Sequence, residues 1–199
     1  MNFLAHAYLS FNHPDILAGN MLSDFVKGKK KYQYSSAIQK GITLHRRIDE
    51  FTDGHPATKT AREYFREDYG LYAGAFIDIV YDHFLANDTD EFSDGSALAK
   101  FSQDCYHQLG FYSAIYPEKF KTVFFYMKKQ DWLYHYRFNL GIINSFAGLV
   151  RRSTYMTDHK AAEKIFISHY KSLEFQYQQF FPHLKSFSKN ELEILLASN

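Results

Sequence analysis

The sequence predicts an all-α protein that folds as a helical bundle. Apolar residues recur every three or four positions along most of the 199 residues, whereas alternation with a period of two is weak throughout. Hydrophobic residues make up 46% of the chain and aromatic residues 19%, enough for one ring-rich core. No repeat, low-complexity tract or linker divides the sequence, so residues 1–199 are expected to form a single domain.

Proline and turn residues set the predicted helix boundaries. Pro14, Pro56 and Pro117 each suit a helix start. Short turn signals such as Asp53-Gly54 mark the joins between helices. The predicted helices are 2–11, 14–27, 35–52, 56–67, 71–87, 95–109, 117–128, 138–151, 158–181 and 188–197.

The first two predicted helices each carry polar residues on an apolar face. His6 is the polar exception in helix 2–11. In helix 14–27, Asp24 lies on the apolar face and Asn20 lies one turn earlier. Taken singly, each is explained as a buried polar residue with hydrogen-bond partners. Taken together, they are candidates for one site.

Helix 35–52 places a histidine and an aspartate on its apolar face. Because each helical residue advances about 100° around the axis, His45 and Asp49 point inward together. Arg46 falls at the edge of that face, whereas Arg47 lies on the opposite side. A buried hydrogen-bonded pair at this four-residue spacing would explain His45 and Asp49 without any catalytic role.

Helix 71–87 is apolar around most of its circumference, which predicts a central buried helix. Its one polar stripe carries Asp78 and Asp82 between small residues. Two buried carboxylates this close need a proton, an arginine or a metal ion to persist. His83 is turned about 100° from Asp82, so it approaches the stripe from the side or is structural.

Farther along the chain, segment 158–181 predicts one long amphipathic helix. Ala162, Phe166, His169 and Leu173 recur along one face at spacings of three and four residues. On that stripe, His169 is expected to be a core or boundary histidine.

These inward polar residues predict a divalent metal site between helices. Carboxylate and imidazole ligands projecting from facing helices suit Mn²⁺, Fe²⁺, Mg²⁺ or Zn²⁺. Cys105 is the only cysteine, which excludes a cysteine-based zinc cluster and an intramolecular disulfide. The oxygen-rich ligand set favours Mn²⁺ or Mg²⁺, and such hard cations commonly bind substrate phosphates.

Net charge and hydropathy limit the classes of binding partner that the sequence predicts. The 23 Lys and Arg against 22 Asp and Glu give a net charge of +1, which argues against general nucleic-acid binding. One basic segment, defined by Lys27, Lys29, Lys30 and Lys31, is either a solvated loop or a docking site for an acidic partner. No apolar run approaches the roughly 18 residues of a membrane span, and no signal peptide is apparent. A soluble cytoplasmic protein is therefore expected.

Four ordered segments carry a family resemblance: NFLAH (2–6), GNMLSDFVKG (19–28), GITLHRRID (41–49) and DHFL (82–85). Together they resemble the acyl carrier protein phosphodiesterases. The resemblance implies removal of the 4′-phosphopantetheine arm from holo acyl carrier protein, with Mn²⁺ as cofactor and Mg²⁺ or Fe²⁺ as alternatives. It also implies a fold similar to the HD phosphohydrolases, although this chain lacks a His-Asp dipeptide and reads Asp82-His83 instead.

The resulting hypothesis assigns a role to each candidate residue. One or two divalent ions are held by Asp24, His45, Asp49 and Asp82. The ion lowers the pKa of water for attack on phosphorus, while Arg46 neutralises charge on the phosphoryl oxygens. Proton transfer or ligand orientation falls to His6, Asp78 or His83.

In this hypothesis, the basic segment docks the acidic carrier protein. Two alternatives stay open: an HD-like phosphohydrolase acting on nucleotides or another small phosphate ester, and a non-catalytic helical binding protein with structural His–Asp pairs.

Overall fold

The computed structural model describes residues 1–198 and confirms the all-α class. Within those residues there are eleven α-helices, four 3-10 helices and no strand. The α-helices are α1 (Phe3–Tyr8), α2 (Pro14–Leu22), α3 (Ser36–Gly54), α4 (Pro56–Tyr69), α5 (Ala73–Ala86), α6 (Gly95–Gly110), α7 (Glu118–Lys129), α8 (Trp132–His135), α9 (Asn139–Arg152), α10 (Lys160–Ser168) and α11 (Tyr170–Ala197). The 3-10 helices are η1 (Ser23–Phe25), η2 (Gly28–Gln33), η3 (Gly70–Tyr72) and η4 (Ser113–Ile115).

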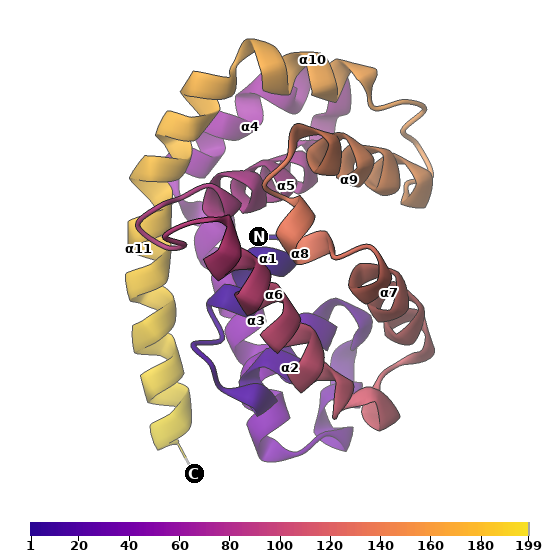
Figure 1. The fold of residues 1–199 in the computed structure, drawn as a ribbon, viewed down its shortest axis with the longest axis vertical. Coiled ribbons are helices and arrows are strands. Elements are labelled where there is room, and N and C mark those ends of the chain that lie inside the picture. Colours follow the sequence, from indigo (N-terminus) through magenta and orange to yellow (C-terminus); the bar gives the residue numbers. More distant parts are fainter. Residues whose placement is uncertain (199) are drawn as a thin grey trace.

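The short N-terminal helix α1 lies in the middle of the molecule, close to α5 and α8 in the view of Figure 1. It packs against α2 on one side and α5 on the other. Helix α5 is buried over most of its length, as its sequence predicts. The long helix α11 runs along one side of the molecule, where it packs on α3 and α4. Side-chain contacts join α1 to both α3 and α5, and these three helices carry most of the predicted site residues.

Helices α2 and α3 approach each other unusually closely. A Cβ atom on Gly41 would lie 2.5 Å from the carbonyl oxygen of Ile16, and one on Gly19 would lie 2.1 Å from the carbonyl oxygen of Ile38. Only glycine permits that approach of two backbones. The contact fixes α3 against the segment that leads from α2 into η1, and hence His45 against Asp24.

Two of the long predicted helices are interrupted in the structure. The helix predicted over 14–27 ends at Leu22 and continues as the 3-10 helix η1. The predicted helix 158–181 is broken at His169, which is exposed at the N-cap of α11 instead of lying in a core stripe. The break lets α10 pack on α9 while α11 turns along α3.

The predicted separate helix 188–197 is the end of α11, which runs through Pro182. An interior proline removes one helical hydrogen bond, at a cost of about 3 kcal/mol. Burial of Phe180, Phe181 and Leu184 around it offsets that cost. Within residues 1–198, no helix combines the length and apolar character needed to cross a membrane.

Candidate metal centre

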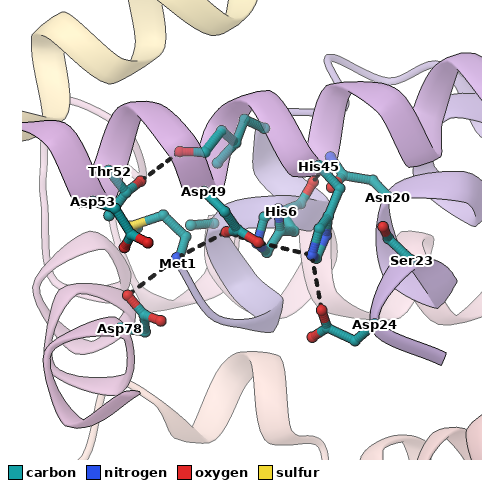
Figure 2. Close-up of polar contacts among 12 residues, drawn as sticks. Met1, His6, Asn20, Ser23, Asp24, His45, Asp49, Thr52, Asp53 and Asp78 are labelled. Atoms are coloured by element: carbon teal, nitrogen blue, oxygen red, sulfur yellow. Dashed lines mark hydrogen bonds and ion pairs between the residues drawn. The ribbon is translucent and has the colours of Figure 1, made fainter. Parts of the chain in front are cut away.

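Two helices bring together a cluster of three potential metal ligands. His6 comes from α1, and His45 and Asp49 come from α3; each offers one ligand atom, and these atoms lie within 4.8 Å of one another. The two imidazole rings are stacked, with centroids 3.8 Å apart and an interplanar angle of 15°. Figure 2 shows Asp24 of η1 reaching toward the same point from the other side of His45. We call His6, His45 and Asp49 the metal cluster.

The predicted contact between His45 and Asp49 is present. His45 Nε2 lies 3.1 Å from Asp49 Oδ2 and 3.1 Å from Asp24 Oδ1. His6 Nε2 lies 3.2 Å from Asp49 Oδ1 but without hydrogen-bond geometry, so both nitrogens of this buried ring lack a hydrogen-bond partner. Buried polar atoms without partners are uncommon in native proteins. An unpartnered imidazole nitrogen beside a carboxylate and a second imidazole fits a metal ligand set.

The cluster has a buried side and an open side. The side chains of His6 and His45 are only 4% and 6% exposed, whereas those of Asp49 and Asp24 are 39% and 70% exposed. The imidazoles therefore form the inner wall and the carboxylates form the rim. The cluster therefore faces solvent on the carboxylate side.

The pKa values of the two histidines are shifted in opposite directions. Burial and, to a smaller extent, the nearby His45 together lower the pKa of His6 to about 4. Burial also acts to lower the pKa of His45, but hydrogen bonds to Asp24 and Asp49 outweigh it and raise that pKa to about 9. Burial would raise the pKa of Asp49, yet the amino terminus and His6 hold it far below its usual range. At neutral pH the cluster is thus neutral His6, protonated His45 and ionised Asp49.

Asp78 lies on the far side of the amino terminus from His6. The amino nitrogen of Met1 is 3.1 Å from Asp78 Oδ1 and 3.3 Å from Asp49 Oδ1 (Figure 2). Burial acts to lower the pKa of this amino group, but the two carboxylates raise it to about 11. The sequence-based prediction missed this group, because a main-chain nitrogen leaves no side-chain signal in a residue pattern.

Asp82, predicted as a fourth ligand, lies outside the cluster of His6, His45 and Asp49. It is fully buried, and its two oxygens accept hydrogen bonds from the backbone N–H groups of Leu4 at 2.7 Å and Ala5 at 3.1 Å. These amides belong to the first turn of α1, whose N-cap residue Asn2 makes no side-chain cap. Burial raises the pKa of Asp82 to about 7 despite these bonds. Asp82 thus caps the helix that carries His6.

His83 is also separate from the metal cluster. Its Nδ1 lies 2.8 Å from the carbonyl oxygen of Tyr136, and its Nε2 lies 3.0 Å from the hydroxyl of Tyr170. Burial lowers the pKa of His83, although the carbonyl contact partly opposes this. Both ring nitrogens are engaged, so His83 ties α5 to α11 and to the segment after α8.

The arginines of α3 point in different directions. Arg46 is exposed and donates a hydrogen bond to the carbonyl oxygen of Val26 at 3.2 Å, which places it beside the end of η1. Arg47 pairs with Glu191 of α11 instead. Of the two, Arg46 is the one directed toward the segment that carries Asp24.

The basic segment lies directly after Asp24 in the chain. Lys27 precedes η2, and Lys29, Lys30 and Lys31 lie within it. None of the four forms an ion pair with the described part of the chain, residues 1–198. Phe25 packs against Phe120 of α7, with ring centroids 5.2 Å apart, and so anchors the start of this segment.

Asn20 positions the metal cluster indirectly. Its Nδ2 donates to the carbonyl oxygen of His6 at 2.8 Å and contacts Ser10 Oγ at 3.2 Å. Its side chain is completely buried. It therefore joins α2 to the residue of α1 that enters the cluster.

Comparison with known proteins identifies the family of this chain. Residues 1–184 match the acyl carrier protein phosphodiesterase family. A protein of Photorhabdus laumondii is 31% identical over 191 residues, covering 96% of both chains, and one of Yersinia enterocolitica is 32% identical over 186 residues, covering 94% of this chain and 96% of its own. Both are named acyl carrier protein phosphodiesterase. No solved structure matches, so the likeness to HD phosphohydrolases stays a prediction. The chain belongs to the acyl carrier protein phosphodiesterase family.

Proposed function

We propose that this protein hydrolyses the phosphodiester that links 4′-phosphopantetheine to holo acyl carrier protein. The products are apo carrier protein and 4′-phosphopantetheine. The metal cluster of His6, His45 and Asp49, in a chain of this family, is the observation that carries the proposal. Its open carboxylate edge suits a substrate presented by another protein.

His6, His45 and Asp49 would hold a divalent ion, with Asp24 as a further ligand. Two imidazoles and carboxylate oxygens suit Mn²⁺ or Fe²⁺ better than Mg²⁺, which prefers oxygen ligands alone. We therefore favour Mn²⁺. When bound, such an ion supplies Lewis-acid polarisation of the phosphoryl oxygens and lowers the pKa of water.

The remaining polar residues bind the phosphoryl group or hold the ligand residues in place. Arg46 presents a guanidinium on the exposed side of η1, where it pairs with phosphoryl oxygens and offsets their charge. Asp78 acts through the Met1 amino group that holds Asp49 in place. Asp82 and His83 serve the fold, since each is already engaged by backbone or tyrosine partners.

The test of this function is direct. Purified protein is incubated with holo acyl carrier protein and Mn²⁺, and the carrier mass is followed with and without a chelator. We expect loss of the pantetheine arm only in the presence of the metal. Absence of that loss, together with turnover of nucleotides or simple phosphate esters, would instead support an HD-like phosphohydrolase. No turnover and no Mn²⁺ binding would support a non-catalytic binding protein.

Paired substitutions test the ligand set. His6→Gln is expected to abolish Mn²⁺ binding and turnover with an intact helical spectrum. Asp82→Asn should retain Mn²⁺ binding but lower the unfolding free energy by about 1–3 kcal/mol, because one buried N–H of α1 loses its acceptor. Calorimetry with Mn²⁺ and thermal unfolding measure the two effects. Mn²⁺ binding lost in Asp82→Asn at unchanged stability would contradict the structural role.

A further inference from the structure

A cavity lies between α4 and α5, on the Asp78 side of the metal cluster. It has a volume of about 360 Å³ and is lined by Asp53, Arg62, Arg66, Gly74 and Asp78 among others. That size falls within the roughly 300–1,000 Å³ of small-molecule sites. None of the roles assigned to the metal cluster explains two arginines at this position.

Asp78 and the Met1 amino group connect the cavity to the metal cluster. Asp78 lines the cavity, and its Oδ1 contacts the same Met1 nitrogen that contacts Asp49. Figure 2 shows Asp53 and Asp78 on one side of Met1, with His6 and His45 on the other. A molecule bound at the carboxylate edge of the cluster can therefore extend along α3 into the cavity.

Arg62 provides an unused donor there. Its guanidinium pairs with Asp53 through one terminal nitrogen, but its Nε is buried and has no hydrogen-bond partner. The absence of a side chain at Gly74 makes room for this group, since a Cβ there would lie 3.2 Å from Arg62 Nε. A buried N–H without an acceptor is uncommon. It indicates that an acceptor comes from a ligand.

The charges of the cavity define the class of ligand. Two arginines face two aspartates in the lining, and the Met1 amino group on Asp78 and Glu63 on Arg66 add one charge of each sign. The charges therefore balance, and the cavity does not select a second phosphate. It offers guanidinium donors and carboxylate acceptors at close range. Such a lining matches a neutral chain with amide carbonyls, amide N–H groups and hydroxyls. The pantetheine part of the substrate has this chemistry.

We propose that the cavity between α4 and α5 binds the pantetheine arm of the substrate, with Arg62 donating a hydrogen bond to an amide carbonyl of the arm. This inference rests on the proposed function and adds the subsite that recognises the group to be released. In this arrangement the phosphodiester lies at the metal cluster and the arm runs past Asp78 toward Gly74.

The test compares three ligands by calorimetry on the Mn²⁺-loaded protein: 4′-phosphopantetheine, pantetheine and inorganic phosphate. Wild-type protein is expected to bind 4′-phosphopantetheine more tightly than phosphate. Arg62→Met should weaken 4′-phosphopantetheine and pantetheine about tenfold, the effect of one charged hydrogen bond, and leave phosphate unchanged. Gly74→Ala, which keeps every charge, should weaken the same two ligands by crowding Arg62. Lys59→Met, an equal charge change at an exposed position of α4, should match wild type.

Two results would overturn the subsite. One is equal binding of 4′-phosphopantetheine by wild type and Arg62→Met, and the other is wild-type binding of 4′-phosphopantetheine no tighter than that of phosphate. The proposed function fails separately: wild-type protein would then leave holo carrier protein intact while Arg62 still governs pantetheine binding. If the carrier protein is cleaved and Arg62→Met binds 4′-phosphopantetheine as wild type does, only the proposed pantetheine subsite is wrong.

Discussion

The three residues of the metal cluster differ in the protons they hold before any ion binds. His6, with its pKa lowered to about 4 by burial and by His45, is neutral at pH 7 and ready to ligate. Asp49 is ionised. His45, with a pKa raised to about 9 because its bonds to Asp24 and Asp49 outweigh burial, is protonated. Binding of a metal ion at these three residues would therefore displace one proton, and that proton would come from His45.

This difference predicts a pH-dependent metal affinity. Below pH 9 the proton on His45 competes with the ion, so affinity for Mn²⁺ should rise about tenfold per pH unit and level off above pH 9. At pH 7 binding should release close to one proton. Calorimetry in two buffers of different ionisation enthalpy measures that release. An affinity that does not change between pH 6.5 and pH 8 would contradict the assignment of His45.

Among the elements, the close contact between α2 and α3 sets the relative positions of Asp24 and His45. The glycine contact sets the distance between η1, which carries Asp24, and the middle of α3, which carries His45. Helix α1 is held by its caps at both ends, Asp82 at its start and Asn20 at His6. The contact between α2 and α3 positions His45 and Asp49 relative to Asp24, and the two caps of α1 position His6.

Gly41→Ala tests the helix crossing. A methyl group there would lie 2.5 Å from the carbonyl oxygen of Ile16, so the helices must separate. We expect a loss of about 1–3 kcal/mol in unfolding free energy, with a fall of about 2–4 °C in Tm per kcal/mol for a chain of this size. Weaker Mn²⁺ binding should accompany it, because His45 moves away from Asp24.

Gly110→Ala is the matched control, because no atom lies within 4 Å of the added methyl group at the end of α6. Its Tm should be unchanged or slightly higher, as alanine favours helix. A similar loss of stability in both variants would show that steric overlap at the crossing is not the cause.

At the scale of the whole molecule, the basic segment follows closely on Asp24, the exposed carboxylate beside the metal cluster. The segment begins three residues after Asp24, and Arg46 links α3 to Val26 between them. Four lysines without internal ion partners in residues 1–198 present positive charge beside the open carboxylate edge. An acidic carrier protein docked on them would deliver its pantetheine arm to the cluster.

Charge reversal tests this docking. Lys29→Glu with Lys30→Glu should raise KM for the carrier protein about tenfold and leave kcat nearly unchanged, because docking charges act mainly on association. Added salt should raise the wild-type KM in the same direction. Lys164→Glu with Lys189→Glu makes the same net change at exposed positions of α10 and α11 and should match wild type. An unaltered KM in the Lys29 and Lys30 variant would show that the basic segment is a solvated loop with no docking role.

The fold class and part of the candidate site could be predicted from hydrophobic periodicity alone. A helical repeat fixes which side of its own helix a residue occupies, so the all-α class and the contact between His45 and Asp49 followed from the sequence. The helix ends near 22 and 169 did not follow, because packing against other helices decides where each one stops. Local pattern carries no information about those partners.

The composition of the site was decided only by the tertiary structure. Asp82 and His6 both point inward by sequence, yet Asp82 binds the backbone of α1 while His6 joins His45 and Asp49. That choice depends on distances between α1, α3 and α5, which are set by packing across many residues of chain. A helix supplies the direction of a side chain, but only the contact between helices determines what that side chain meets.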